Sequence, residues 1–199
     1  MEKQEKLSNE ELGKYRSFLI GMAMPAGEQA GFIGVFGLTT GDESLVLIDE
    51  FESPDIIEMV DSLAWLTVKF SFRDATYPYG DFIFADEADD ALRDMLAKRR
   101  IKLAYSPLSF GKEEQKPFMT LLPQINQARR DGIIIVGDEM LLSIRLKDEV
   151  LQNPANVRFG DAPALESLCY AYFGWQELKR QGTEQPEIEE TYNCLTWEL

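Results

Sequence analysis

The fold of this chain is decided by three apolar runs near its beginning: Ser17-Phe-Leu-Ile-Gly-Met-Ala-Met24, Phe32-Ile-Gly-Val-Phe-Gly-Leu-Thr39 and Ser44-Leu-Val-Leu-Ile-Asp-Glu-Phe51. Each run is rich in the aromatic and β-branched residues that favour strands. The first two are separated by Gly27-Glu-Gln-Ala-Gly31 and the last two by Thr40-Gly-Asp-Glu43. Because both connections are short and rich in turn-forming residues, the pattern predicts two consecutive antiparallel hairpins.

A helix and further strands are predicted to follow. Ser53-Pro54 is typical of a helix start, and apolar residues at 56, 57, 60, 63 and 64 repeat with helical spacing. The apolar run 68–73 predicts a fourth strand, residues 89–99 a second helix, and residues 101–105 a fifth strand. This order predicts an α/β fold, in which a mixed sheet of three antiparallel strands and then parallel strands is flanked by helices.

The remaining helices are predicted from capping signals and from periodicity. Ser8-Asn-Glu-Glu11 has the spacing of a capping box, and Pro123 lies inside a helical pattern, where a break or kink is expected. The predicted segments are helices at 8–15, 112–130, 138–151 and 161–179, and an extended piece at 132–136.

The length of 199 residues suits a single domain, which we expect to span 1–180 and to be followed by an acidic C-terminal tail over 181–199. The end of this tail, Tyr192 to Leu199, could dock back onto the domain or contact a partner. No apolar stretch is long enough to span a bilayer and no signal peptide is recognisable, so no membrane partner and a cytoplasmic location are expected.

The composition excludes several kinds of catalysis. The chain has no histidine, and Cys169 and Cys194 are its only cysteines, so Ser-His-Asp and Cys-His sites and ordinary zinc sites are excluded. Catalysis would therefore depend on carboxylates, lysines or hydroxyls, most plausibly with a hard cation such as Mg²⁺ or Mn²⁺. The net charge of −15 opposes strong DNA binding. Basic residues cluster only at 98–102 and 129–130, at predicted helix ends, where they complement the helix dipole.

Three stretches together resemble the nuclease domain of the large terminase subunit of tailed phages, which has a ribonuclease H-like fold. Phe18-Leu-Ile-Gly-Met-Ala-Met-Pro-Ala-Gly27 is similar to the family's first strand, and Phe72-Arg-Asp-Ala-Thr-Tyr-Pro-Tyr-Gly80 to its fourth strand. Gly160-Asp-Ala-Pro-Ala-Leu-Glu-Ser-Leu-Cys-Tyr-Ala171 is similar to its closing helix. The resemblance covers about residues 15–178. Nothing in the chain resembles the ATPase motor of a full terminase. It implies a metal-dependent DNA endonuclease scaffold and a partner in phage DNA packaging, or another protein partner.

The resemblance also implies a site of converging carboxylates. Two cations held by such a cluster bind the attacking and leaving oxygens of a phosphodiester. Asp74 and Asp161 would be catalytic residues and metal ligands, and Glu28 would be a further, substitute ligand. The alternative is a purely structural role for both residues, in which Asp161 caps its helix and Asp74 accepts hydrogen bonds from loop amides. The acidic residues at 81, 86, 87, 89 and 90 are interpreted as a solvated loop and helix start.

One departure from the family pattern bears on activity. The first strand of the family ends in an aspartate, where this chain has Met24, or Ala23 if the register shifts by one. A thioether is a poor ligand for Mg²⁺, so metal binding should be weakened unless Glu28 or Asp49 substitutes. Three hypotheses follow: a nuclease with an atypical carboxylate set, a non-catalytic interaction or assembly module on the same scaffold, and an unrelated acidic α/β binding protein.

Overall fold

The computed structural model describes residues 13–25, 28–41, 43–70, 81–85, 90–99, 101, 121–152 and 162–184. The elements in chain order are β1 (Tyr15–Ala23), β2 (Gly31–Thr39), β3 (Leu45–Ser53), α2 (Ile56–Lys69), β4 (Phe82–Ala85), α3 (Asp90–Lys98), α4 (Leu122–Arg130), β5 (Ile134–Ile135), α5 (Leu141–Gln152) and α6 (Pro163–Glu184).

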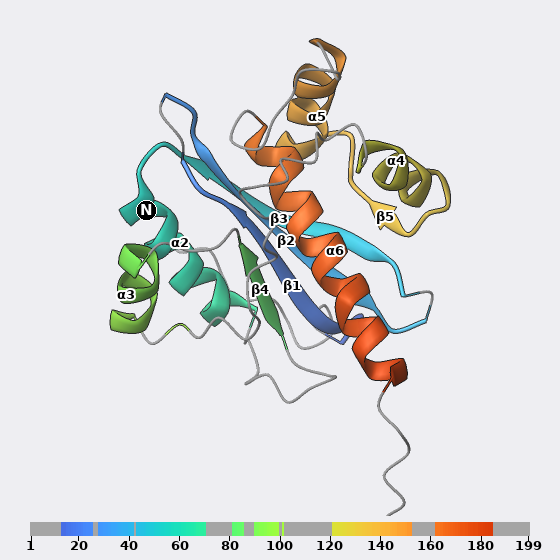
Figure 1. The fold of residues 1–199 in the computed structure, drawn as a ribbon, viewed down its shortest axis with the longest axis horizontal. Helices are drawn as coiled ribbons and strands as arrows, with labels where there is room; N and C mark the ends of the chain where they lie inside the picture. The colour runs from blue at the N-terminus through green and yellow to red at the C-terminus, as the bar shows by residue number, and fades with distance from the viewer. Residues whose placement is uncertain are drawn as a thin grey trace, which may run out of the picture.

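The strands form one mixed sheet with the order β4-β1-β2-β3-β5. β1, β2 and β3 pair as consecutive antiparallel hairpins, as the three apolar runs predict. β4 then pairs in parallel with β1, and β5 pairs in parallel with β3 at the other edge (Figure 1). The predicted fold class, a mixed sheet flanked by helices, is therefore confirmed.

The fourth strand is not the run at 68–73. Residues 68 and 69 form the last turn of α2, and Phe70 is its C-cap. Buried side chains of α2 recur at 59, 63 and 66 and continue to Phe70, which is a helical spacing, so residues 68–70 of this run belong to the helix and its cap, and residues 71–73 lie outside the described residues. The fourth strand is instead the short segment Phe82–Ala85, which is buried on both faces and therefore shows no alternation of polar and apolar residues.

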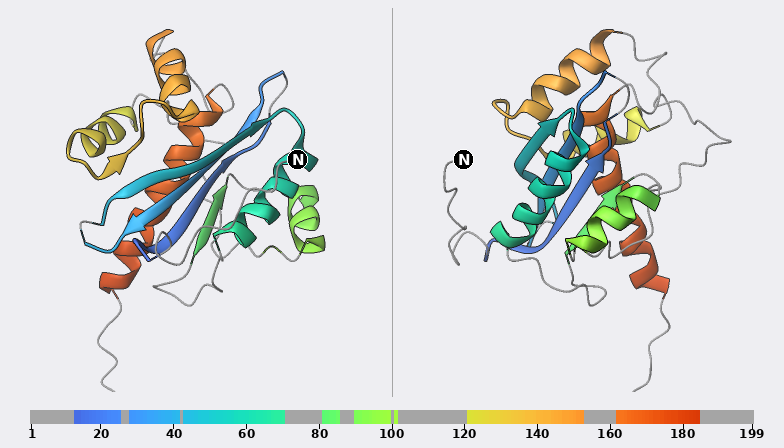
Figure 2. Two further views of the ribbon diagram at one scale, coloured as in Figure 1. Left: turned by 180° about the vertical axis from the view of Figure 1, so that it is seen from behind. Right: turned by 90° about the vertical axis from the view of Figure 1, so that its left-hand side faces the viewer.

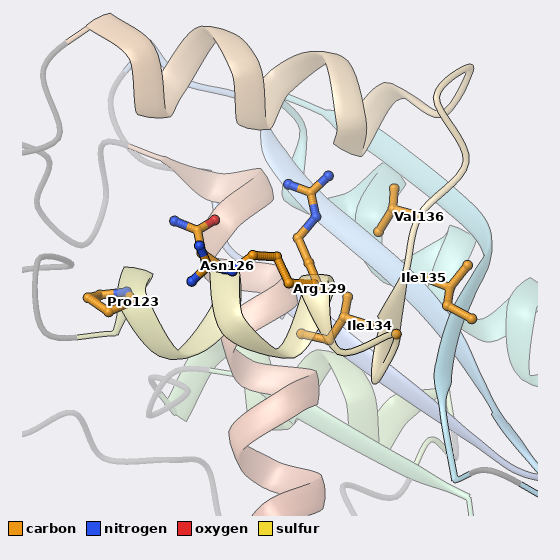
Figure 3. A pocket seen from close by; sticks show the side chains of 8 residues that line it. Pro123, Asn126, Arg129, Ile134, Ile135 and Val136 are labelled. Atoms are coloured by element: carbon orange, nitrogen blue, oxygen red, sulfur yellow. The ribbon is translucent and has the colours of Figure 1, made fainter.

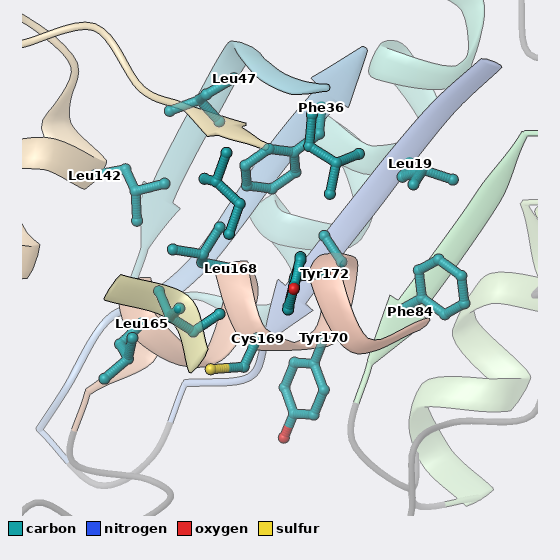
Figure 4. Packing of buried hydrophobic residues seen from close by; sticks show 14 of the residues in the cluster. Leu19, Phe36, Leu47, Phe84, Leu142, Leu165, Leu168, Cys169, Tyr170 and Tyr172 are labelled. Atoms are coloured by element: carbon teal, nitrogen blue, oxygen red, sulfur yellow. The ribbon is translucent and has the colours of Figure 1, made fainter. Parts of the chain in front are cut away.

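Two apolar clusters fill the two faces of the sheet. Figure 2 shows α2 on one face of the sheet and α6 on the other. One cluster joins the sheet to α2 through Phe18, Ile20 and Met22, which pack with Leu63 and Leu66. The other joins the sheet to α6, and Figure 4 shows Leu165 and Leu168 of this helix among the side chains packed with Phe36. The sheet is therefore covered on both faces, as expected where a crossover helix precedes a parallel strand.

The start of β4 is fixed to β1 by a buried carboxylate. Asp81 is 4% exposed, and its Oδ1 accepts a hydrogen bond of 2.7 Å from the backbone N–H of Phe18. A carboxylate in this position satisfies a backbone donor that burial would otherwise leave unpaired. The interpretation of the acidic residues from Asp81 onward as a solvated loop is thus wrong for Asp81.

Other element boundaries differ from the predictions. Tyr15 belongs to β1 rather than to a helix at 8–15, and residues 8–12 lie outside the described ranges. Pro123 lies in the first turn of α4, where its missing N–H is tolerated, and residues 112–120 of the predicted longer helix lie outside the described residues. α6 extends to Glu184, beyond the predicted end near Lys179. Residues 102–105 of the predicted fifth strand are outside the described residues.

α5 receives its N-terminal cap from the sheet. The two carboxylate oxygens of Glu50 on β3 accept hydrogen bonds from the backbone N–H groups of Leu141 and Leu142, the second at 2.8 Å. The positive end of a helix dipole and its free N–H groups favour a negative charge there. Glu52, which lies two positions after Glu50 on β3, forms an ion pair of 2.9 Å with Arg145 of α5. The acidic side chains of β3 therefore hold α5 in place.

Replacing Glu50 by alanine should destabilise the domain by about 1–3 kcal/mol, because two partly buried backbone donors of α5 lose a charged acceptor. Urea denaturation measures this loss, and hydrogen exchange of the amides at 141–146 locates it. The matched control is Glu52→Ala on the same strand, which removes a partly exposed ion pair and should cost less than about 1 kcal/mol. Equal losses for the two variants would contradict the capping role of Glu50.

Among the helices of the described segments, none combines the length and the apolar character that spanning a bilayer requires.

Candidate active site at the ends of β1 and β4

β1 and β4 end at the same edge of the sheet. They run in parallel, with Leu19 opposite Phe82 and Met22 opposite Ala85. The carboxyl ends of adjacent parallel strands are where α/β proteins commonly place functional side chains. β1 ends at Ala23 and β4 at Ala85, so any residues that follow these strands start from neighbouring positions.

α6 crosses β1 with almost no space between the two backbones. The Ser167 hydroxyl donates a hydrogen bond of 2.9 Å to the Gly21 carbonyl. A Cβ on Gly21 would lie 1.8 Å from the Ser167 carbonyl oxygen, so only glycine fits at this crossing. The small residue thus sets the distance between α6 and the strand that carries the candidate site.

The direction of α6 places its first turn towards the end of β1. Near its other end, Lys179 forms an ion pair of 2.5 Å with Glu43, and Glu43 also contacts Arg16 at the beginning of β1 at 3.2 Å. From the crossing at Gly21 the helix therefore runs back towards the start of β1, and its N-terminus points the other way (Figure 1). The end of β1 and the start of α6 therefore lie on one side of the sheet, whereas β4 packs against α6 further along the helix, where the Phe84 ring lies against Gly174.

The alternation of side chains decides which residue of β1 faces α6. Leu19 and Ala23 pack in the α6-side cluster, and Gly21 contacts Ser167 of α6 itself. Met22 belongs to the α2-side cluster, and Met24 packs against that cluster. Ala23, which is 1% exposed, is thus the last β1 residue on the α6 face, whereas Met24 lies on the opposite face.

The structure describes some of the predicted site residues and leaves others outside its described ranges. Asp74 and Asp161 lie outside the described residues, and Asp161 directly precedes the fully buried Ala162 at the start of α6. Glu28 is exposed, in the turn between β1 and β2. Asp49, the other substitute considered, lies on β3, and its carboxylate is paired with Lys69 of α2 at 2.7 Å. It is therefore committed to the α2 face of the sheet.

Sequence reasoning missed the residue that follows the true fourth strand. With β4 ending at Ala85, the next residue of the chain is Asp86. The premise that Asp74 closes the fourth strand is wrong, because residues 68–70 complete α2. The signal was present in the sequence as the apolar segment Phe82-Ile-Phe-Ala85 directly before an acid, although four residues are short for a confident strand.

Cys169 of α6 lies close to this site in the sequence but takes no part in its chemistry. It is completely buried, and this burial raises the pKa of its thiol, with a smaller contribution from the negative charge of Glu166. A thiol held neutral in this way is neither a nucleophile nor a metal ligand. Within the described ranges no group of three or more acidic or cysteine side chains is arranged to hold a metal ion.

No protein-family model and no curated protein sequence matches the chain. Several solved structures do match it in three dimensions. The large terminase nuclease from the thermophilic phage G20c is 17% identical with a TM-score of 0.55, and the match covers 81% of this chain and 86% of that chain. The nuclease domain of the g2p large terminase from bacteriophage SPP1, solved with bound Mn, is 14% identical with a TM-score of 0.50, covering 86% and 94%.

The third similar structure is the large terminase from another thermophilic bacteriophage, which is 10% identical with a TM-score of 0.53. This match covers 84% of the present chain but 41% of that longer terminase chain. The G20c nuclease has also been solved with bound zinc and with bound magnesium. At these identities the likeness concerns the fold. The chain thus has the ribonuclease H-like fold of phage large terminase nuclease domains, as its sequence resemblance implies.

Proposed function

We propose that this chain is a nuclease-like domain of the terminase type whose carboxylate site is incomplete, so that it cuts DNA weakly or not at all. The observation that carries the proposal is the identity of Ala23. This residue ends β1 on the face where α6 begins, and it offers no ligand. A cluster that holds two divalent cations needs oxygen ligands from several elements, and the first strand provides none here.

Asp86 takes the role that the sequence resemblance gave to Asp74 in this proposal. Met22 pairs with Ala85, and in this proposal the parallel register would continue by one residue, so that Asp86 would stand opposite Ala23. Side chains opposite each other in neighbouring strands share a face of the sheet, which would direct Asp86 towards α6. Asp161 completes the proposed set, because it directly precedes the buried first residues of that helix.

The described residues do not fit a resident pair of metal ions. Ala23 and Met24 at the strand end have no hard oxygen ligand, and Asp49 is neutralised by Lys69 on the other face. Glu28 is the described carboxylate nearest to Ala23 in the sequence, and its exposed position in a turn gives it no fixed geometry at the site. Displacement by even one ångström is costly for such chemistry.

The charge of the whole chain supports the same conclusion. A net charge of −15 repels the phosphate backbone unless a basic surface compensates it. In the basic cluster at 98–102, Arg99 is engaged by Asp61 at 2.6 Å, whereas Arg129 and Arg130 of the second cluster have no acidic partner among the described residues. The second candidate function is therefore a non-catalytic interaction or assembly module, with a phage packaging protein or another protein as its partner. Ala23 favours this candidate as well.

The test is nicking of supercoiled plasmid DNA in Mn²⁺ and in Mg²⁺ by the full chain. We expect either no cleavage above a no-protein control, or slow cleavage that Asp86→Asn and Asp161→Asn abolish. Asp74→Asn and Glu28→Gln are the matched controls, and cleavage that depended on Asp74 would overturn the assignment of Asp86. Efficient cleavage that survives both Asp86→Asn and Asp161→Asn would contradict the proposal altogether.

A further inference from the structure

The groove between α4 and β5 is the candidate that the proposed function leaves unexplained. It has a volume of about 640 Å³. Its lining is Pro123, Asn126, Arg129, Arg130, Gly132, Ile134, Ile135 and Val136. In Figure 3 the side chains of Asn126 and Arg129 rise from the same side of α4, and Val136 lies across from Arg129.

The two arginines of this groove have no acidic partner among the residues that the structure describes. Within those residues no hydrogen bond or ion pair engages the Arg129 guanidinium, and Arg130 donates only to the neutral amide of Gln127, at 3.0 Å. The neighbouring carboxylate of Asp131 is hydrogen-bonded to Gln127 as well. In a chain with 35 acidic and 20 basic residues, two adjacent uncompensated cations are unusual, and they define a site for a negatively charged group.

The groove also has an apolar side. Ile135 is 45% exposed, and Pro123 and Val136 line the same space. β5 is an edge strand of the described sheet, and edge strands accept added segments of extended chain. A phosphate backbone would use the arginines but not the apolar wall. A peptide with acidic residues followed by aromatic residues would use both.

The chain itself contains such a peptide after α6. Residues 185–199 read Gln-Pro-Glu-Ile-Glu-Glu-Thr-Tyr-Asn-Cys-Leu-Thr-Trp-Glu-Leu, with acids at 187, 189, 190 and 198 and large apolar or aromatic residues at 188, 192, 195, 197 and 199. This segment is the part of the predicted C-terminal tail that follows α6, and it is called the acidic tail from here on. It has the charge and the apolar groups that match the groove. A peptide of this length reaches roughly 50 Å when extended.

The last turns of α6 are linked to the groove by short contacts. Lys179 pairs with Glu43, and the hydrogen bond and charge of Lys179 lower the pKa of Glu43. The adjacent Ser44 donates its hydroxyl to the carbonyl of Gly132 at 2.9 Å, and Gly132 lines the groove. The tail therefore leaves α6 well within its own reach of the groove. From these observations we propose that the acidic tail of the same molecule occupies the groove between α4 and β5.

Docking in the same molecule gives the tail a high effective concentration at the groove, which a disulfide-trapping experiment can measure. In the full chain, Ile135→Cys provides a groove thiol that can pair with the natural Cys194 of the tail. Val68→Cys is the matched control, because Val68 is 58% exposed on α2, which packs on the opposite face of the sheet. Cys169 is buried and does not compete.

With oxidised glutathione as the oxidant, we expect the intramolecular disulfide of Ile135→Cys to form at least about tenfold faster than that of Val68→Cys. Intact mass and non-reducing gels distinguish it from a disulfide between two molecules. Arg129→Gln combined with Arg130→Gln should reduce the rate towards that of the control. Equal rates at the two positions, or a disulfide mainly between molecules, would overturn the proposal.

A second measurement needs no new cysteine. Replacing Glu187, Glu189 and Glu190 by glutamine in the full chain should increase hydrogen exchange at the amides of 133–136, because the tail would leave the groove more often. Unchanged exchange would contradict docking. Fluorescence anisotropy with a labelled DNA duplex tests the other occupant: tight binding that requires Arg129 and Arg130 would identify the groove as a nucleic-acid site and overturn the tail proposal. These outcomes do not depend on whether the chain cuts DNA.

Discussion

Ala23→Asp is expected to strengthen divalent-cation binding at the end of β1, where the natural residue offers no ligand. The new carboxylate would extend from the end of β1 on the α6 face and would lie opposite Asp86 in the extended register. Mn²⁺ affinity should rise by at least about 10–100-fold, since loss of an outer-sphere partner alone changes affinity by that factor. Isothermal titration calorimetry measures the affinity, and plasmid nicking reports whether activity accompanies it.

The matched control for this gain is Met24→Asp. The side chain of Met24 packs against the α2-side cluster, so a carboxylate there would face away from the start of α6. It should give no gain in Mn²⁺ affinity. In the Ala23→Asp background, Asp86→Asn and Asp161→Asn should each remove the gain. If Met24→Asp gained affinity and Ala23→Asp did not, the assignment of faces at the candidate site would be wrong.

Without metal, Ala23→Asp should lower the melting temperature. Ala23 is 1% exposed, so the new carboxylate would be buried, and a buried charge without a partner is costly in the absence of a cation. Added Mn²⁺ should restore the stability, because a ligand that binds only the folded state shifts the folding equilibrium by mass action. This metal-dependent recovery distinguishes a rebuilt site from a merely damaged core.

Gly21→Ala is expected to cause the largest loss of stability of any single methyl addition considered. The new Cβ would lie 1.8 Å from the Ser167 carbonyl oxygen, which is a backbone atom on a buried helix. α6 would have to move away from β1 along its length, at a cost of about 3 kcal/mol or more. Urea denaturation followed by circular dichroism measures this cost.

Gly41→Ala is the control for this substitution. A Cβ on Gly41 would meet nothing within 4 Å among the described residues, so its effect should stay within about 0.5 kcal/mol. Retention of natural stability by Gly21→Ala would mean that α6 is not seated on β1 as described. Because the same crossing positions the start of α6, Gly21→Ala should also abolish any Mn²⁺ affinity gained by Ala23→Asp.

The sequence predicted the sheet well because its first strands are long and joined by short turns. Residues 17–51 contain the pairing information within a local segment, and the hairpins followed directly. The helix predicted after Ser53-Pro54 is confirmed as α2, but the prediction was wrong in assigning residues 68–70 to a strand and in leaving Phe82–Ala85 unassigned. α2 begins at Ile56 after an Asp55 cap and extends to Lys69, and Ile57, one of the apolar residues that fitted the helical spacing, is 52% exposed. A four-residue strand that is buried on both faces leaves no periodic signal to correct this.

The ligand types considered for the candidate site came from the composition, whereas the faces on which Ala23 and Met24 lie had to come from the structure. The absence of histidine and the excess of acids pointed to carboxylates and hard cations. Whether Ala23 or Met24 faces the helix depends on a single residue of register, and such a step reverses the face of every side chain in a strand. The same applies to the aspartates: residues 68–70 complete α2 and the residue that follows β4 in the chain is Asp86, while the roles of Asp74 and Asp86 stay predictions. Register is set by tertiary pairing and had to come from the structure.

The sheet separates the two apolar clusters, and this separation has a practical consequence for any attempt to rebuild catalysis. Substitutions at distant sites without shared partners usually add in their effects on stability. Better packing between α2 and the sheet, around Leu63 and Leu66, would therefore compensate for a charged residue introduced at Ala23 without rearranging the opposite layer. The two layers can be optimised as independent compartments, one for robustness and the other for chemistry.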